Sequence, residues 1–174
     1  ITPMWQLIQE IAANPSDKTK VTLLYGNKTE ADILLREKFD ELSKDSRFNI
    51  VYFLDENAKS VKSEKGYITK DHVKKYLPDA EKGEKAKIFV CGPPPMVGAI
   101  AGPKQGFQQG ELKGVLSELG YKAEQVFKFK LIRIVRYMKT NSIFSFTIIV
   151  TILELQGVGC MKVLGAVQVT YPVS

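Results

Sequence analysis

Short continuous runs of apolar residues alternate with segments of helical periodicity over most of the chain. Runs of this kind are typical of strands that are buried on both faces of a sheet. We predict four such strands, at residues 21–25, 48–54, 86–91 and 125–129. Parallel neighbours need a long crossover between them, usually a helix, so the alternation predicts an α/β fold. In this fold a parallel sheet is covered by helices on both faces.

Segments between these strands carry helical signals. The first predicted helix begins at Thr2-Pro3, where proline is tolerated in a first turn, and apolar residues follow at helical spacing. Thr29 and Asp32 form a capping-box pattern that predicts the start of a second helix. Its apolar face would carry Leu35, Phe39 and Leu42. Shorter helices are predicted near residues 70–77 and 110–119, and the polar stretch 55–65 is predicted as a loop.

Loops that follow the strands are where a fold of this kind places its ligands. In this sequence they are residues 26–29, 55–66 and 92–96. A helix that begins at Thr2 should itself follow a strand and a phosphate-cradling turn. We therefore expect the first strand of the sheet to lie upstream of Ile1 and to be missing from this chain.

Composition excludes several other classes of protein. The chain has 174 residues, of which 44% are hydrophobic and 25% charged, which is ordinary for one globular core. Two cysteines are too few for a disulfide scaffold of this size. The net charge of +6 comes mostly from residues 130–174, which hold five basic side chains and one acidic one. No basic stripe interleaved with aromatics runs through the rest, so we expect no nucleic-acid partner.

The hexapeptide Cys91-Gly92-Pro93-Pro94-Pro95-Met96 is the most unusual motif in the chain. Three prolines fix three φ angles and remove three donors, and Gly92 lets another group approach the backbone. A rigid backbone segment beside a thiol is suited to a ligand with a flat ring that must be held in one orientation. The alternative is a stiff turn beside a buried cysteine that acts only as a small hydrophobe.

Asp55 follows a predicted strand directly. An acid in this place can accept hydrogen bonds from a ribose 2′-hydroxyl and repel a 2′-phosphate, or it can simply be solvated, as can its neighbour Glu56. Thr2 at the start of the first helix can bind a phosphate or cap the helix. His72, the only histidine, is expected to be a surface residue rather than a base. No cluster of cysteines and histidines has metal-ligand spacing, so we expect no metal site.

Five motifs occur together, in order and at matching spacing, and they carry a resemblance to a known family. They are Ile1-Thr2-Pro3-Met4, Tyr25-Gly26-Asn27-Lys28-Thr29-Glu30, Asp32-Ile33-Leu34-Leu35-Arg36, Gly66-Tyr67-Ile68-Thr69 and the hexapeptide at Cys91. Residues 1–129 resemble the NAD-binding domain of the NADH–cytochrome b5 reductases, in the ferredoxin-reductase-like flavoenzyme superfamily with its Rossmann-like fold. Gln109–Gly114, Leu119–Tyr121 and Gln125–Phe129 resemble the mitochondrial form.

This resemblance implies a two-step electron transfer and a set of site residues. NADH would pass a hydride to FAD, which a separate N-terminal domain mainly binds, and the flavin would pass single electrons to cytochrome b5 or a similar haem acceptor. By the same resemblance Asp55 would set the preference for NADH, and Cys91 would lie near the hydride path. The other implied cofactor-binding residues are Thr2, Pro3, Gly26, Asn27, Thr29, Gly92, Pro93, Pro94 and Met96.

The resemblance also implies a location, the mitochondrial outer membrane or intermembrane space, with membrane attachment through a segment upstream of Ile1. As a fragment the chain is expected to be inactive alone and to bind nucleotide weakly. Two alternatives stay open. One is the reductase module of another flavoprotein, such as a nitrate reductase. The other is a non-catalytic nucleotide-binding remnant that lacks a flavin domain.

Residues 130–174 fall outside the resemblance. The apolar run Ile143–Leu153 is 11 residues long, whereas about 20 are needed to span a bilayer. The preceding basic residues Arg133, Arg136 and Lys139 also allow attachment to a membrane surface. The segment is either read-through or intron-derived sequence from an erroneous gene model, or a genuine extension. If genuine, its β-branched run would favour aggregation unless it paired with the sheet.

Overall fold

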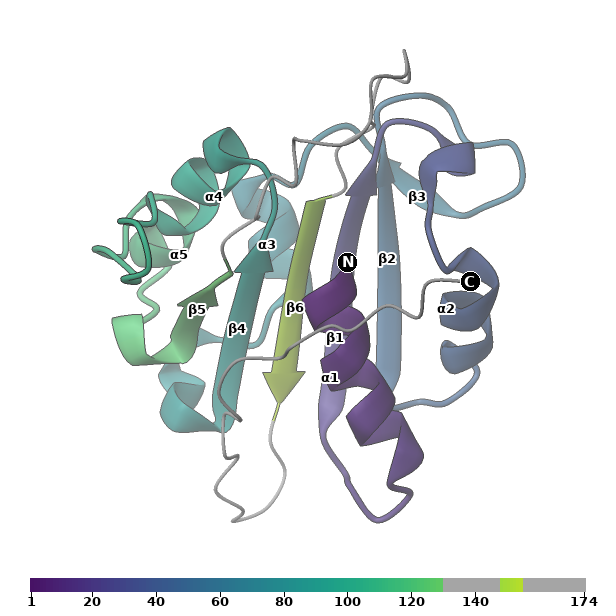
Figure 1. The fold of residues 1–174 in the computed structure, drawn as a ribbon, viewed down its shortest axis with the longest axis horizontal. Helices are drawn as coiled ribbons and strands as arrows, with labels where there is room; N and C mark the ends of the chain where they lie inside the picture. The colour runs from purple at the N-terminus through teal and green to yellow at the C-terminus, as the bar shows by residue number, and fades with distance from the viewer. Residues whose placement is uncertain (130–147, 155–174) are drawn as a thin grey trace, which may run out of the picture.

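The computed structural model describes residues 1–129 and 148–154, which form one six-stranded sheet with helices on both faces (Figure 1). The elements in chain order are α1 (Thr2–Ala13), β1 (Lys20–Asn27), the 3-10 turn η1 (Glu30–Asp32), α2 (Arg36–Leu42), β2 (Phe48–Leu54), β3 (Ser63–Lys65), α3 (Lys70–Tyr76), η2 (Ala80–Lys85), β4 (Ala86–Cys91), α4 (Pro94–Ala101), α5 (Gly114–Glu118), η3 (Ala123–Gln125), β5 (Val126–Lys128) and β6 (Ile148–Glu154). The order in the sheet is β3-β2-β1-β6-β4-β5. The predicted α/β class is confirmed.

Most strands of the sheet are parallel, but its central strand is not. β1 with β2, β2 with β3, and β4 with β5 pair in parallel, whereas β6 runs antiparallel to both β1 and β4. The predicted parallel sheet is confirmed for the strands of residues 1–129, and β6, which lies outside them in sequence, adds an antiparallel strand between β1 and β4. β1 and β4 each offer a row of backbone donors and acceptors to the position between them, and β6 pairs with both rows.

The position that β6 fills can be compared with the expected first strand. The connection from β1 through α2 to β2 leads away from β6, and α1 and α2 contribute to the same apolar cluster. Suppose that a strand before α1 were connected through α1 to β1 with the same handedness. That strand would lie on the side of β1 away from β2, in the position that β6 occupies. Residues 148–154 therefore occupy the place where a strand preceding α1 is expected.

Two apolar clusters, one on each face of the sheet, form the core. Side chains alternate along the strands: Leu23 and Tyr25 belong to the cluster under α1 and α2, and Leu24 belongs to the cluster under α3, α4 and α5. In the first cluster Phe39 is fully buried, with the Trp5 ring edge-on at 5.3 Å. This alternation is what the continuous apolar runs of a doubly covered sheet predict.

Four local predictions need correction. Leu35 lies in the left-handed region at φ 59° and divides the helix expected from Thr29 into η1 and α2. Residues 63–65, expected in a loop, pair with the end of β2. The helix expected at residues 110–119 is confined to Gly114–Glu118, because the chain before it turns at Gly110 with φ 67°. Pro94 and Pro95 are not part of a loop but form the first turn of α4, where their missing N–H groups cost no helical bond.

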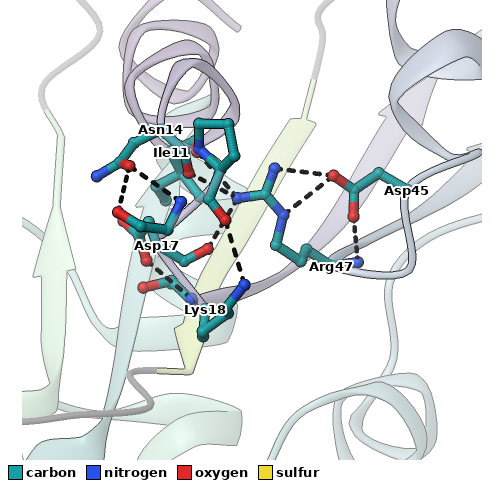
Figure 2. A network of polar contacts seen from close by, with 9 residues as sticks. Ile11, Asn14, Asp17, Lys18, Asp45 and Arg47 are labelled. Carbon is teal, nitrogen blue, oxygen red and sulfur yellow. Dashed lines mark hydrogen bonds and ion pairs between the residues drawn. The ribbon is translucent and has the colours of Figure 1, made fainter.

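Arg47 joins the end of α1 to the start of β2 (Figure 2). Its Nη1 donates to the carbonyl oxygens of Ile11, Asn14 and Asp17 at 3.2, 3.0 and 2.8 Å. The other side of the guanidinium donates to Asp45 Oδ2 from Nη2 at 2.8 Å and from Nε at 3.0 Å. Carbonyls at the end of a helix have no partner within it, so this arginine supplies one. The network fixes the direction of α1. Its last turn lies beside the start of β2, and its first residues point toward the end of the sheet at which β2 finishes.

Candidate functional site

The predicted site residues meet at the edge where β1, β2 and β4 end. β6 is antiparallel to both β1 and β4, so those two strands point the same way, and β2 is parallel to β1. Asn27, Leu54 and Cys91 therefore finish their strands at a common edge. The first turn of α1 lies toward this edge, because Arg47 holds the other end of the helix at the start of β2. Figure 1 shows β1, β2 and β4 with their arrowheads in the same direction.

Gly26 and Asn27 lie within β1 rather than in the turn after it. Gly26 pairs with Phe53 on one side and with Ile148 on the other, and both Gly26 and Asn27 are buried. The loop therefore begins at Lys28. Thr29 follows it, and its backbone N–H and its hydroxyl both donate to Asp32 Oδ2, at 2.9 and 2.8 Å. The capping box forms as predicted, but it closes a 3-10 turn.

Asp55 is the first residue after β2 and its side chain is exposed. Its backbone N–H donates to the carbonyl of Asn27 at 3.3 Å, and that of Glu56 donates to the carbonyl of Lys28 at 3.0 Å. These two bonds hold the start of the 55–62 loop against the end of β1. A carboxylate in this place can accept hydrogen bonds from a ligand lying across the two strand ends.

Cys91 ends β4 and is 5% exposed, and burial raises the pKa of its thiol. The thiol is therefore protonated at neutral pH, which argues against a nucleophile and agrees with a packing or positioning role. Gly92 is buried and Pro93 is half-buried at the N-cap of α4. Pro94 is exposed, and Met96 packs against the cluster under α3, α4 and α5.

Thr2 and Pro3 form the first turn of α1. The N-cap residue is Ile1, and within the described residues no side chain caps this helix, so the capping role considered for Thr2 is not observed. The Thr2 side chain is exposed. First-turn amides of a helix attract anions, so an exposed hydroxyl here is suitably placed for a phosphate.

His72 lies in the first turn of α3, which packs on the face of the sheet opposite α1. The backbone N–H of Thr69 donates to His72 Nδ1 at 3.2 Å, and the imidazole lies edge-on to Phe53 at 4.9 Å. It is half-buried, not the surface residue expected, and it helps to begin α3. Within residues 1–129 and 148–154 no three His, Cys, Asp or Glu side chains are grouped so that they could hold a metal. In the same part of the chain no helix is long and apolar enough to cross a bilayer.

Sequence reasoning missed the part played by Glu30, although it quoted the motif that contains it. The Glu30 carboxylate accepts hydrogen bonds from the backbone N–H groups of Lys59 and Ser60, at 2.8 and 3.1 Å, and from the Ser60 hydroxyl. Arg36 Nη1 donates to the same carboxylate at 2.7 Å. The only hint in the sequence was an acid directly after a strand-end turn, and the contact was missed because Glu30 and Lys59 lie 29 positions apart in the sequence.

Comparison with known proteins shows what the chain is similar to. Residues 1–102 match the family described as oxidoreductase NAD-binding domain. The chain is 64% identical over 132 residues to NADH-cytochrome b5 reductase 2 of Mycosarcoma maydis, covering 74% of this chain and 37% of that protein. It is 52% identical over 132 residues to the protein of the same name in Phaeosphaeria nodorum, covering 74% of this chain and 39% of that one. The chain thus spans less than half the length of these relatives.

A solved structure is also similar. It is the crystal structure of the cytochrome b5 reductase domain of Ulva prolifera nitrate reductase, with a TM-score of 0.58 and 35% sequence identity. The similarity covers 74% of this chain and 44% of the solved one.

Proposed function

The chain belongs to the oxidoreductase NAD-binding domain family, and from that premise we propose that it is the NADH-binding part of an NADH–cytochrome b5 reductase. One observation carries the proposal. Asp55, the first turn of α1 and the motif that begins at Cys91 meet at one edge of the sheet, in a chain 64% identical to a protein named NADH-cytochrome b5 reductase 2.

The residues at this edge fit a dinucleotide. The exposed carboxylate of Asp55 suits the ribose hydroxyls of the adenosine half, and the first turn of α1 with Thr2 and Pro3 suits the pyrophosphate. Gly26, Asn27 and Thr29 would border the nucleotide between them. At the far end Gly92 offers a buried backbone without a side chain, beside the stiff Pro93-Pro94 junction that would support the nicotinamide.

Cys91 and Met96 would set the position of the nicotinamide instead of reacting with it. The protonated thiol lies at the end of β4, where its small side chain allows close approach. Hydride transfer depends on the distance and angle between the two cofactors, which rigid packing controls. FAD, held by a domain outside this chain, would supply the conversion of a two-electron hydride into single electrons.

We propose FAD as the second cofactor, cytochrome b5 or a similar haem protein as electron acceptor, and a mitochondrial membrane location reached through a segment outside this chain. The domain boundary near Phe129 is supported by alignments that extend over 132 residues. Residues 130–174 would then be an extension to the domain, of which 148–154 pair with the sheet.

A second candidate is the reductase module of a nitrate reductase, which the similarity to the Ulva prolifera domain favours. Sequencing the mature transcript upstream of Ile1 and across the Phe129–Lys130 junction separates the candidates. A flavin-binding barrel alone upstream supports the cytochrome b5 reductase, and additional haem and molybdenum domains support the second candidate. A transcript that starts near Ile1 and runs through Ser174 supports the nucleotide-binding remnant.

The activity itself is tested in a fusion of this chain to the flavin-binding barrel of a cytochrome b5 reductase. We expect NADH to reduce the flavin much faster than NADPH does, and the reduced flavin to reduce cytochrome b5. A fusion that binds FAD but shows no reduction by NADH would refute the proposal.

A further inference from the structure

The Glu30 carboxylate is the anchor of a bond network that joins two loops of the candidate site. Its Oε2 accepts the backbone N–H groups of Lys59 and Ser60, and its Oε1 accepts the Ser60 hydroxyl and Arg36 Nη1. Arg36 Nη2 also donates to Ser60 Oγ at 3.0 Å. The Glu30 side chain is 17% exposed, and these bonds, the Ser60 hydroxyl above all, lower its pKa to about 2. Glu30 is therefore ionised at every pH at which the protein would work.

This network holds the far end of the loop that carries Asp55. The near end is already held, because Asp55 and Glu56 donate their backbone N–H groups to the carbonyls of Asn27 and Lys28. Lys59 and Ser60, four and five residues after Asp55, are held by Glu30, which lies three residues after Asn27. Both ends of the 55–60 segment are thus attached to one short stretch of chain, residues 27–30.

Glu30 is itself held in place independently of that loop. It begins the turn η1, which the bonds from Thr29 to Asp32 close. Neither Glu30 nor Arg36 belongs to the apolar clusters that stabilise the sheet. Ala58 and Val61 also pack against the cluster under α1 and α2, so loss of the Glu30 carboxylate should loosen the polar part of the 55–60 loop while the core keeps its structure.

We propose that Glu30 is a positioning residue for nucleotide recognition: it holds the 55–60 loop so that the Asp55 carboxylate faces the ribose. The inference rests on the proposed function, since Asp55 needs a nucleotide to recognise. Glu30 acts through the loop and does not touch the ligand. A carboxylate suits this task because its two oxygens accept several donors at once, and charge-assisted bonds of this kind are stronger than neutral ones.

The first readout is hydrogen exchange of the full chain, which needs no ligand. In Glu30→Gln an NH₂ group replaces one of the two acceptor oxygens, and this group faces the donors that the oxygen had bound. The backbone N–H groups of residues 55–62 should therefore exchange faster. Glu37→Gln, an exposed acid in the first turn of α2, removes the same charge without touching the loop and should leave that exchange unchanged. Unchanged exchange of residues 55–62 in Glu30→Gln would overturn the proposal.

The second readout is a double-mutant cycle on nucleotide affinity, measured by calorimetric titration of the fusion to the flavin-binding barrel with NADH and NADPH. Glu30→Gln should raise the Kd for NADH about tenfold and that for NADPH less than about twofold. Combined with Asp55→Ala it should add almost nothing to the loss that Asp55→Ala causes alone. Additive losses, or equal losses for both nucleotides, would assign Glu30 a general structural role and overturn the positioning role.

The two readouts separate this proposal from the proposed function. A fusion of the wild-type chain to the flavin-binding barrel that binds FAD but neither nucleotide refutes the NADH-binding function, and with it the role of Glu30 in recognition. The exchange data then still decide whether Glu30 holds the loop.

Discussion

Tyr25 and Cys91 lie on opposite sides of Ile149, and each is its partner in the sheet register. The last residues of β1 and β4 are therefore joined through Ile149, which comes from a distant part of the sequence. Within the described residues, β1 and β4 have no direct pairing, so β6 connects the β3-β2-β1 half of the sheet to the β4-β5 half. The edge that carries the candidate site depends on this connection.

A proline in β6 should consequently destabilise the whole domain. Val150 lies opposite Leu24 on one side and Val90 on the other, and a central strand donates each N–H to one neighbour or the other. We expect Val150→Pro to lower the free energy of unfolding by about 3 kcal/mol, measured by urea denaturation. Asn57→Pro, in an exposed loop, is the control. Equal stability of Val150→Pro and wild type would mean that β6 does not hold the sheet together.

Asp55→Ala should reduce the preference for NADH over NADPH. The substitution removes the carboxylate that accepts ribose hydroxyls and repels a 2′-phosphate, so we expect the ratio of the two affinities to fall about tenfold. Calorimetric titration of the fusion to the flavin-binding barrel with each nucleotide measures this ratio. Glu56→Ala removes the neighbouring exposed acid and should leave the ratio unchanged. If Glu56→Ala has the larger effect, the recognising acid is Glu56.

The ion pair between Glu64 and Lys75 should contribute to acid sensitivity. Lys75 Nζ and the Tyr76 hydroxyl donate to Glu64 Oε1, and they lower the pKa of this carboxyl to about 2. A carboxyl whose folded pKa lies below its unfolded value stabilises the fold above the unfolded pKa, near 4.5. That contribution is lost as the pH falls toward 2. We expect Glu64→Gln to flatten the stability profile between pH 5 and pH 2, whereas Glu37→Gln should leave its slope unchanged.

Replacement of the Arg47 guanidinium should destabilise the fold, because its hydrogen-bond network depends on the planar geometry of that group. Lysine keeps the charge but cannot donate to three carbonyls and to Asp45 at once. We expect Arg47→Lys to cost about 2 kcal/mol of unfolding free energy in urea denaturation, because the carbonyls of Ile11, Asn14 and Asp17 lose a donor that they share. Lys44→Ala, at an exposed position, is the control. A cost below about 0.5 kcal/mol would mean that water replaces the arginine.

Local patterns predicted the parts of the fold that depend on neighbours in sequence. Continuous apolar runs located β1, β2 and β4, and the residues after them identified the site edge, because parallel strands end together. The position of β6 could not be predicted, because an apolar run near the C-terminus does not indicate the strands with which it pairs. The left-handed Leu35 gave no signal either, because this conformation is unusual for leucine. The Glu30 network was missed for a related reason, as its bonds join residues about 30 apart.

Cys91→Ser should slow hydride transfer without unfolding the domain. The side chain is nearly isosteric, but at 5% exposure the hydroxyl is less suited than a thiol to an apolar surrounding, so a cost of about 1 kcal/mol is expected. If Cys91 sets the approach of the nicotinamide, stopped-flow reduction of the flavin by NADH should slow about tenfold in the fusion protein. Leu116→Met, in the cluster on the far face of the sheet, controls for a general loss of stability. A normal rate of flavin reduction in Cys91→Ser would leave this cysteine with packing as its only role.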